Sequence, residues 1–65
     1  MIIEKDIIIG LRFRLKETGR TYEVTDVGDK SVWFKDLSRN IEFRELKHLF
    51  PRYFLPNSSF YLVKK

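Results

Sequence analysis

The sequence predicts a single all-β domain, folded as a small antiparallel barrel of five strands with one short helical turn. Three observations favour this fold. The 65 residues include neither Ala nor Gln, which are good helix formers. Apolar and polar residues alternate with a period of two, and turn-forming residues interrupt the alternation about every ten residues. A chain of this length fills one domain, so residues 1–65 are treated as a single unit.

The first hairpin is predicted from two alternating segments, residues 11–16 and residues 21–25. Residues 17–20 between them contain a Gly that can adopt positive φ and close a turn. Residues that face each other across antiparallel strands lie on the same face of the sheet. A four-residue loop at 17–20 therefore pairs Phe13 with Val24.

The second hairpin leads from residues 21–25 into a strand at residues 31–35, and its register depends on the loop length. A two-residue loop at Gly28 would place Val24 on the same face as Trp33. A three-residue loop at 28–30 places Val24 opposite Phe34 instead. We expect the longer loop, because it keeps one apolar face through successive strands.

The third hairpin joins residues 31–35 to a strand at residues 41–44 through a polar connection at 37–40. This loop pairs Phe34 with Phe43 and Trp33 with Arg44. The pairing leaves Phe34 and Phe43 on the predicted apolar face and Trp33 on the opposite face.

The periodicity changes after the fourth strand. Apolar residues at positions 46, 49 and 50 follow helical spacing, which predicts one short helical turn at about 44–50. Pro51 is expected to end that turn. A loop follows, and a last strand is predicted at residues 59–63. The apolar N-terminal residues 2–3 and 7–9 are not assigned to an element.

The predicted core consists of the residues that the alternation places on one face of the first four strands, together with one apolar residue of the helical turn and two of the last strand. Its members are Leu11, Phe13, Leu15, Tyr22, Val24, Val32, Phe34, Ile41, Phe43, Leu46, Phe60 and Leu62.

The order of these elements resembles the SH3-like small barrel, including its Tudor, chromo-like and KOW-type nucleic-acid modules. The resemblance rests on Gly10-x-Arg12-Phe13 and on Thr18-Gly19-Arg20-x-Tyr22-x-Val24, and it extends over residues 8–63. The chain departs from peptide-binding SH3 domains, because it lacks their acidic, aromatic-rich first loop and its 44–58 connection is long. The resemblance implies a fold and transfers no functional residue.

Several functions are excluded by the composition. The chain has no Cys, one His and none of the motifs of nucleotide-binding or hydrolytic sites, so we expect no enzyme activity, metal, cofactor or small-molecule substrate. Charged residues at 4–6 interrupt any signal-peptide pattern, and no apolar stretch is long enough to cross a membrane. We expect a cytoplasmic protein without a membrane partner.

A basic face around Trp33 is the first candidate site. The chain carries a net charge of +4, and five cations fall on the face opposite the predicted core with only two carboxylates, Glu23 and Glu42. Single-stranded nucleic acids bind surfaces where aromatic rings stack on bases and cations hold phosphates. The predicted nucleic-acid-binding residues are Arg12, Arg14, Lys16, Trp33, Lys35 and Arg44.

A purely structural interpretation of this face remains open. Arg14 with Glu23, and Lys35 with Glu42, would form ordinary cross-strand ion pairs. Arg44 or the N-terminal isoleucines would then cover Trp33.

A second candidate site is the aromatic segment at residues 50–55, which predicts an interface with another protein or with a second copy in a homodimer. The alternative is that this segment covers the end of the barrel. The predicted interface residues are Phe50, Arg52, Tyr53, Phe54 and Leu55. The sequence thus predicts a non-enzymatic binding module with nucleic acid as ligand, and protein docking as the alternative.

Overall fold

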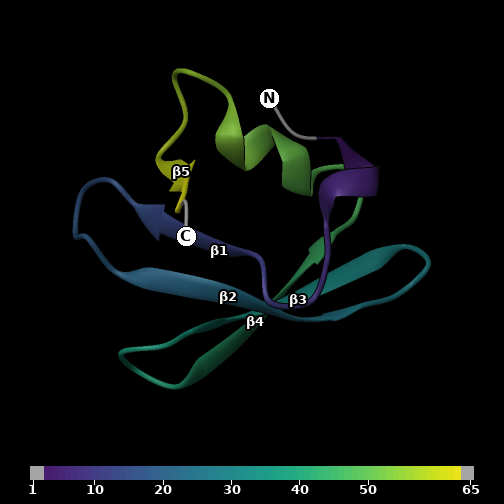
Figure 1. Cartoon of the computed structure of the whole chain (residues 1–65), viewed down its shortest axis with the longest axis horizontal. Coiled ribbons are helices and arrows are strands. Elements are labelled where there is room, and N and C mark those ends of the chain that lie inside the picture. The colour runs from purple at the N-terminus through teal and green to yellow at the C-terminus, as the bar shows by residue number, and fades with distance from the viewer. Residues whose placement is uncertain (1–2, 64–65) are drawn as a thin grey trace.

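The computed structural model describes residues 3–63, and it confirms an all-β fold with five antiparallel strands in one sheet. Two short 3-10 helices complete the chain (Figure 1). In chain order the elements are η1 (Glu4–Asp6), β1 (Arg12–Leu15), β2 (Thr21–Val27), β3 (Ser31–Asp36), β4 (Ile41–Leu46), η2 (Phe50–Phe54) and β5 (Phe60–Leu62).

The strands lie side by side in the order β4-β3-β2-β1-β5. The first four form a continuous meander, and β5 returns to pair with β1 (Figure 1). Within residues 3–63, β4 and β5 each have one strand partner, so the described sheet is open between them. η2 and the N-terminal segment lie on the same side of the strongly twisted sheet (Figure 1).

The helical turn predicted at 44–50 is wrong in position. The chain stays paired with β3 beyond β4, where the Lys47 N–H donates a 2.8 Å hydrogen bond to the Lys30 carbonyl. The helix that forms is η2, and Pro51 lies in its first turn instead of ending it. A Pro fits there because the first N–H groups of a helix have no intrahelical acceptor.

The first hairpin is shifted by two residues from its predicted register. Phe13 lies opposite Tyr22 instead of Val24, and Arg14 opposite Thr21 instead of Glu23. The loop closes one residue earlier than expected, with Gly19 at φ +74° donating to the Leu15 carbonyl over 2.8 Å. A shift of two preserves the face of every side chain, so the inward residues remain inward.

The second hairpin pairs Val24 with Phe34 as predicted. The pairing arises from a β-bulge in β2 and not from the predicted three-residue loop. Its tip is tight, because the Gly28 N–H donates to the Ser31 carbonyl over 2.8 Å and Val27 lies opposite Val32. The register changes at Thr25, where an extra residue forms a β-bulge.

The third hairpin has the predicted register. Phe34 lies opposite Phe43, and Trp33 opposite Arg44. Asn40 closes the turn at φ 57°, a conformation that Asn tolerates better than most residues.

Asp36 fixes the start of that turn from inside the protein. Its side chain is fully buried, and one carboxylate oxygen accepts hydrogen bonds from the Ser38 N–H and hydroxyl. The other accepts a 2.7 Å bond from Arg39 Nε. Desolvation raises the pKa of Asp36, but these hydrogen bonds outweigh it and lower the pKa from 3.8 to about 2.

The core is a cluster of aromatic rings centred on Phe13. This side chain has no exposed surface, and five rings surround it at centroid distances of 5.4–5.5 Å. They come from β2, β3, η2 and β5. The five neighbours are Tyr22, Phe34, Phe50, Phe54 and Phe60. Contacts of this kind hold so small a domain together without disulfides.

Three predicted core residues are exposed: Ile41 by 42%, Phe43 by 37% and Leu46 by 44%. All three lie on β4, an edge strand that has a neighbour on one side only. Leu46 also lies on the outer face, because it pairs with Ser31. Two buried residues, Ile7 and Phe50, take places in the core that the alternation did not assign.

Candidate nucleic-acid interface

The outer face of the sheet contains one row of charges that alternates in sign. Arg12 on β1 lies opposite Glu23 on β2, which lies opposite Lys35 on β3, and Lys35 lies opposite Glu42 on β4. Arg12 Nε and Glu23 Oε1 are 2.8 Å apart. This row balances its own charge, so Arg12 and Lys35 contribute less to an anion site than the sequence predicted.

The next row along β1 has a different composition. Arg14 lies between Tyr61 on β5 and Thr21 on β2, with no carboxylate directly across from it. Its Nε is 3.3 Å from the Thr21 hydroxyl, which is neutral, so the predicted ion pair with Glu23 is wrong. The Tyr61 side chain is 41% exposed beside this guanidinium.

Tyr61 was not singled out from the sequence, although its position could have been found there. Phe60 and Leu62 were assigned to the core, and alternation in a strand sends the residue between them to the opposite face. The missing information was that β5 pairs with β1. That pairing places Tyr61 directly opposite Arg14.

Lys16 extends the same surface beyond the end of β1. Its backbone N–H donates to the Ser59 carbonyl over 2.8 Å, and its Nζ lies 3.5 Å from the Pro56 carbonyl oxygen. These contacts hold Lys16 against the segment that leads into β5. A shallow concavity of about 240 Å³ lies here, with Lys16 and Tyr61 in its wall and Leu55 on its rim.

Trp33 occupies a separate part of the outer face. It is half-buried between Asp26 on β2 and Arg44 on β4. Its ring also packs over the β2–β3 tip, where a Cβ atom added to Gly28 would lie 3.2 Å from Cζ3. Because the Asp26 carboxylate is nearby, the surface around Trp33 is less favourable for a phosphate than the surface around Arg14.

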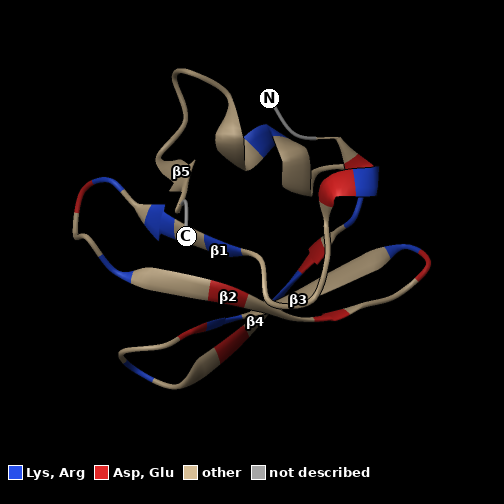
Figure 2. Cartoon of the chain, viewed as in Figure 1, with Lys and Arg blue, Asp and Glu red and all other residues tan. Residues whose placement is uncertain are grey.

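The predicted cations therefore divide into two groups across the sheet. Figure 2 shows basic residues along β1 and acidic residues on β2 and β4. Arg14 and Lys16 lie beside β5, whereas Arg44 lies beside Trp33 near the opposite edge. We refer to Arg14, Lys16 and Tyr61 as the β1–β5 patch.

The predicted protein interface at residues 50–55 is only partly accessible. Phe50 has no exposed surface and packs edge-on against Phe13, so its assignment as an interface residue is wrong for this fold. The Tyr53 hydroxyl donates a 2.6 Å hydrogen bond to Glu45, and Phe54 packs against the core. Leu55, by contrast, is 39% exposed.

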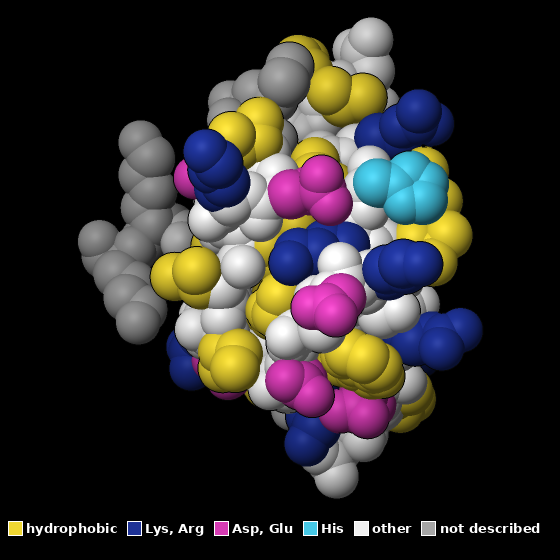
Figure 3. Space-filling view, turned by 90° about the vertical axis from the view of Figure 1, so that its right-hand side faces the viewer, with side chains coloured by type: hydrophobic (Ala, Val, Ile, Leu, Met, Phe, Trp, Pro, Cys, Tyr) yellow, Lys and Arg dark blue, Asp and Glu magenta, His cyan; other side chains and the backbone are white. Residues whose placement is uncertain are grey.

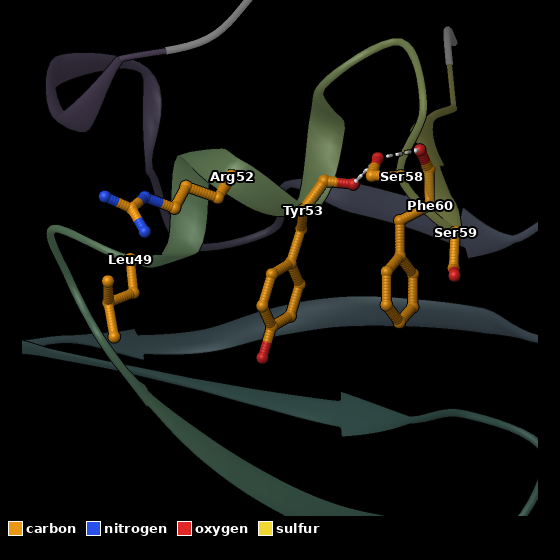
Figure 4. Close-up of a pocket in the computed structure, with 6 residues that line it drawn as sticks. All are labelled: Leu49, Arg52, Tyr53, Ser58, Ser59 and Phe60. Carbon is orange, nitrogen blue, oxygen red and sulfur yellow. Dashed lines mark hydrogen bonds between the residues drawn. The ribbon is translucent and has the colours of Figure 1, made fainter.

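A hollow of about 470 Å³ opens beside η2, and Figure 4 shows the residues around it. The rings of Tyr53 and Phe60 stack at 5.1 Å and 14°, and Arg52 lies at the other side of the hollow. The Ser58 hydroxyl is held by backbone carbonyls, among them those of Tyr53 and Leu55. Since its proton is engaged there, Ser58 is poorly placed to act as a nucleophile.

Figure 3 shows the side of the molecule at the β2–β3 tip, where acidic side chains lie toward the middle and several basic side chains and the His lie along the right-hand edge. A shallow hollow of about 290 Å³ lies there between Asp29 and His48. Across residues 3–63, no three His, Asp or Glu side chains gather closely enough to hold a metal ion. No helix in that range is long and apolar enough to cross a membrane.

Comparison of the chain with known protein families, curated proteins and solved structures finds no match. The geometry of its own residues is therefore the guide to its function.

Proposed function

We propose that the protein is a non-enzymatic binding module that binds single-stranded nucleic acid at the β1–β5 patch. The observation that carries this proposal is the pairing of Arg14 with Tyr61 across β1 and β5, with no carboxylate opposite Arg14. Tyr61 is 41% exposed, so a base could stack on its ring without displacing core residues.

The chemistry of the patch suits a single strand. A base stacked on an aromatic side chain contributes about 1–3 kcal/mol, and this contribution varies little with sequence. Arg14 is on β1, and Lys16 follows directly after its end, where its Nζ lies 3.5 Å from the Pro56 carbonyl oxygen in the segment that leads into β5. Both could contact phosphates while Tyr61 holds a base.

We further propose that the fold is an SH3-like small barrel. This finer assignment is supported by the meander of β1 to β4, by the return of β5 to β1, and by one short 3-10 helix between β4 and β5. The absence of Cys is in keeping with the cytoplasmic location that we propose.

A binding assay with a fluorescent single-stranded 12-mer of mixed sequence tests the nucleic-acid proposal. We expect binding at 50 mM salt that weakens steeply as salt increases. Tyr61→Ala should weaken it roughly 5- to 150-fold, the equivalent of 1–3 kcal/mol. Arg14→Gln should also weaken it and reduce the salt slope by about 0.7.

Two controls locate the site. Arg52→Gln removes an exposed cation of η2, away from the patch, and should change affinity little. Trp33→Ala should have a smaller effect than Tyr61→Ala, whereas a larger one would move the site to β3. Absence of binding at 50 mM salt would refute the proposal.

Docking of another protein is the second candidate function. It is favoured by the 39% exposure of Leu55 and by the hollow beside η2, which has Arg52 on one side and the stacked rings of Tyr53 and Phe60 on the other. An extended peptide with an apolar side chain and a carboxylate fits this chemistry. Arg52→Glu should abolish such binding and leave the affinity for the 12-mer largely intact.

A further inference from the structure

β4 is an edge strand with the properties of an association site. Its six residues pair with β3 alone within the described chain, and two inward-pointing side chains are exposed, Ile41 by 42% and Phe43 by 37%. An edge strand offers unpaired N–H and C=O groups to any other strand. No Pro or bulge interrupts β4.

The hydrogen bonds to β3 determine which backbone groups of β4 are free. The Lys47 N–H points to β3, where it bonds the Lys30 carbonyl. Because the direction alternates along an antiparallel strand, the groups of Phe43 also point to β3. The N–H and C=O groups of Glu42 and Arg44 therefore point outward.

We propose that β4 pairs with β4 of a second copy of this chain, antiparallel, about a two-fold axis at Phe43. In this register Glu42 lies opposite Arg44 of the second copy, and Arg44 lies opposite its Glu42. Both residues direct their backbone groups outward, so each pair can form two backbone hydrogen bonds as well as an ion pair.

The other symmetric registers are less favourable. A two-fold axis at Glu42 would oppose two carboxylates, and an axis at Arg44 would oppose two guanidinium groups. With an axis at Ile41 or Glu45, neither Glu42 nor Arg44 faces a residue of opposite charge on the second copy. A shift by one residue would set outward backbone groups against inward ones. The charge pattern of β4 thus selects the register centred on Phe43.

The side chains around the axis are compatible with this pairing. Phe43 would meet Phe43 of the second copy at a non-hydrogen-bonded position, where side chains approach most closely. Its ring is already held by Phe34, with a centroid distance of 5.5 Å and an angle of 21°. Glu42 Oε2 accepts a 3.3 Å hydrogen bond from the Thr25 hydroxyl, which leaves Oε1 for the guanidinium.

The interface is small, so we expect a weak, concentration-dependent dimer with one continuous ten-stranded sheet. The inference goes beyond the proposed function and does not depend on it. The β1–β5 patch lies at the opposite edge of the sheet, and each copy would keep its patch open.

Sedimentation velocity over a range of protein concentrations tests the dimer. Glu42→Arg places two arginines opposite each other twice, and Arg44→Glu does the same with carboxylates. Each variant should weaken dimerisation roughly 10- to 100-fold. An equimolar mixture of the two variants should form a heterodimer, because both of its pairs are complementary again, and the double variant E42R/R44E should dimerise with itself.

Glu17→Arg is the matched control, since it makes the same charge change in the exposed β1–β2 loop. It should leave the dimer unchanged. The mixture also shows that the single variants are folded. A wild-type chain that stays monomeric at millimolar concentration, or a dimer that both single variants leave unaffected, overturns the proposal.

Discussion

The hydroxyl of Tyr53 donates a 2.6 Å hydrogen bond to Glu45, joining η2 to the edge strand β4. Burial raises the pKa of Tyr53, and the adjacent Glu45 carboxylate raises it further. This bond ties the segment that covers the core to a strand that pairs with β3 alone within residues 3–63.

Replacement of Tyr53 by Phe should therefore destabilise the fold. The substitution keeps the ring that stacks on Phe60 and removes only the hydroxyl, leaving the Glu45 carboxylate short of one donor. We expect a loss of about 1–2 kcal/mol in the free energy of unfolding, measured by urea denaturation. Tyr61→Phe is the control, and its exposed hydroxyl should contribute little. Equal midpoints for the two variants would contradict the role of the bond.

Acid should weaken the fold through Asp36. Its pKa of about 2 in the folded protein lies below the ordinary value of 3.8. The stabilisation is therefore fully present above pH 4 and is lost as the pH falls through 2. Denaturation measured at several pH values should show this loss in the wild type and a flatter profile in Asp36→Asn.

The two ends of the aromatic segment should respond differently to truncation. Phe50 has no exposed surface, whereas Leu55 is 39% exposed. Phe50→Ala should cost about 3–5 kcal/mol, which is enough to unfold much of so small a domain. Leu55→Ala should cost much less and leave the melting temperature within a few degrees. If Phe50→Ala were as stable as Leu55→Ala, the covering role of η2 would be wrong.

Two glycines should give distinguishable effects. A Cβ atom at Gly28 would lie 3.2 Å from Trp33 Cζ3, so Gly28→Ala should displace the half-exposed indole and change its fluorescence emission at little cost in stability. Gly19 has φ +74° and no atom within 4 Å of an added Cβ. Gly19→Ala should cost about 1–2 kcal/mol through backbone strain and leave the emission unchanged.

Much of the sheet could be predicted because alternation is a local property. The inward positions of β1, β2 and β3 and the register of the third hairpin follow from residue spacing alone. The register of the first hairpin depends on which residues form its loop. A four-residue loop that starts one residue earlier gives the same alternation of inward and outward residues. The bulge at Thr25 left no trace in the alternation, although Val24 and Phe34 still met as expected.

The errors concern residues whose surroundings depend on distant segments. The exposure of Phe43 follows from the edge position of β4, which depends on where β5 pairs. The sequence predicts Phe50 as an interface residue because residue spacing alone does not show that η2 lies over Phe13. For the same reason, the sequence predicts only the basic residues of the candidate site. Tyr61 lies opposite Arg14 because β5 pairs with β1, and these strands are far apart in the sequence.

The ring of Phe13 is enclosed by rings from β2, β3, η2 and β5. When this ring rotates by a half-turn about its own axis, it needs volume that its neighbours occupy. A close-packed interior has low compressibility and does not supply that volume without rearrangement. Its neighbours must therefore move apart together before the ring can flip. The flip rate of Phe13, measured from its aromatic NMR resonances, therefore reports how often the whole core expands transiently. The flip rate of the exposed Tyr61 ring reports only local motion.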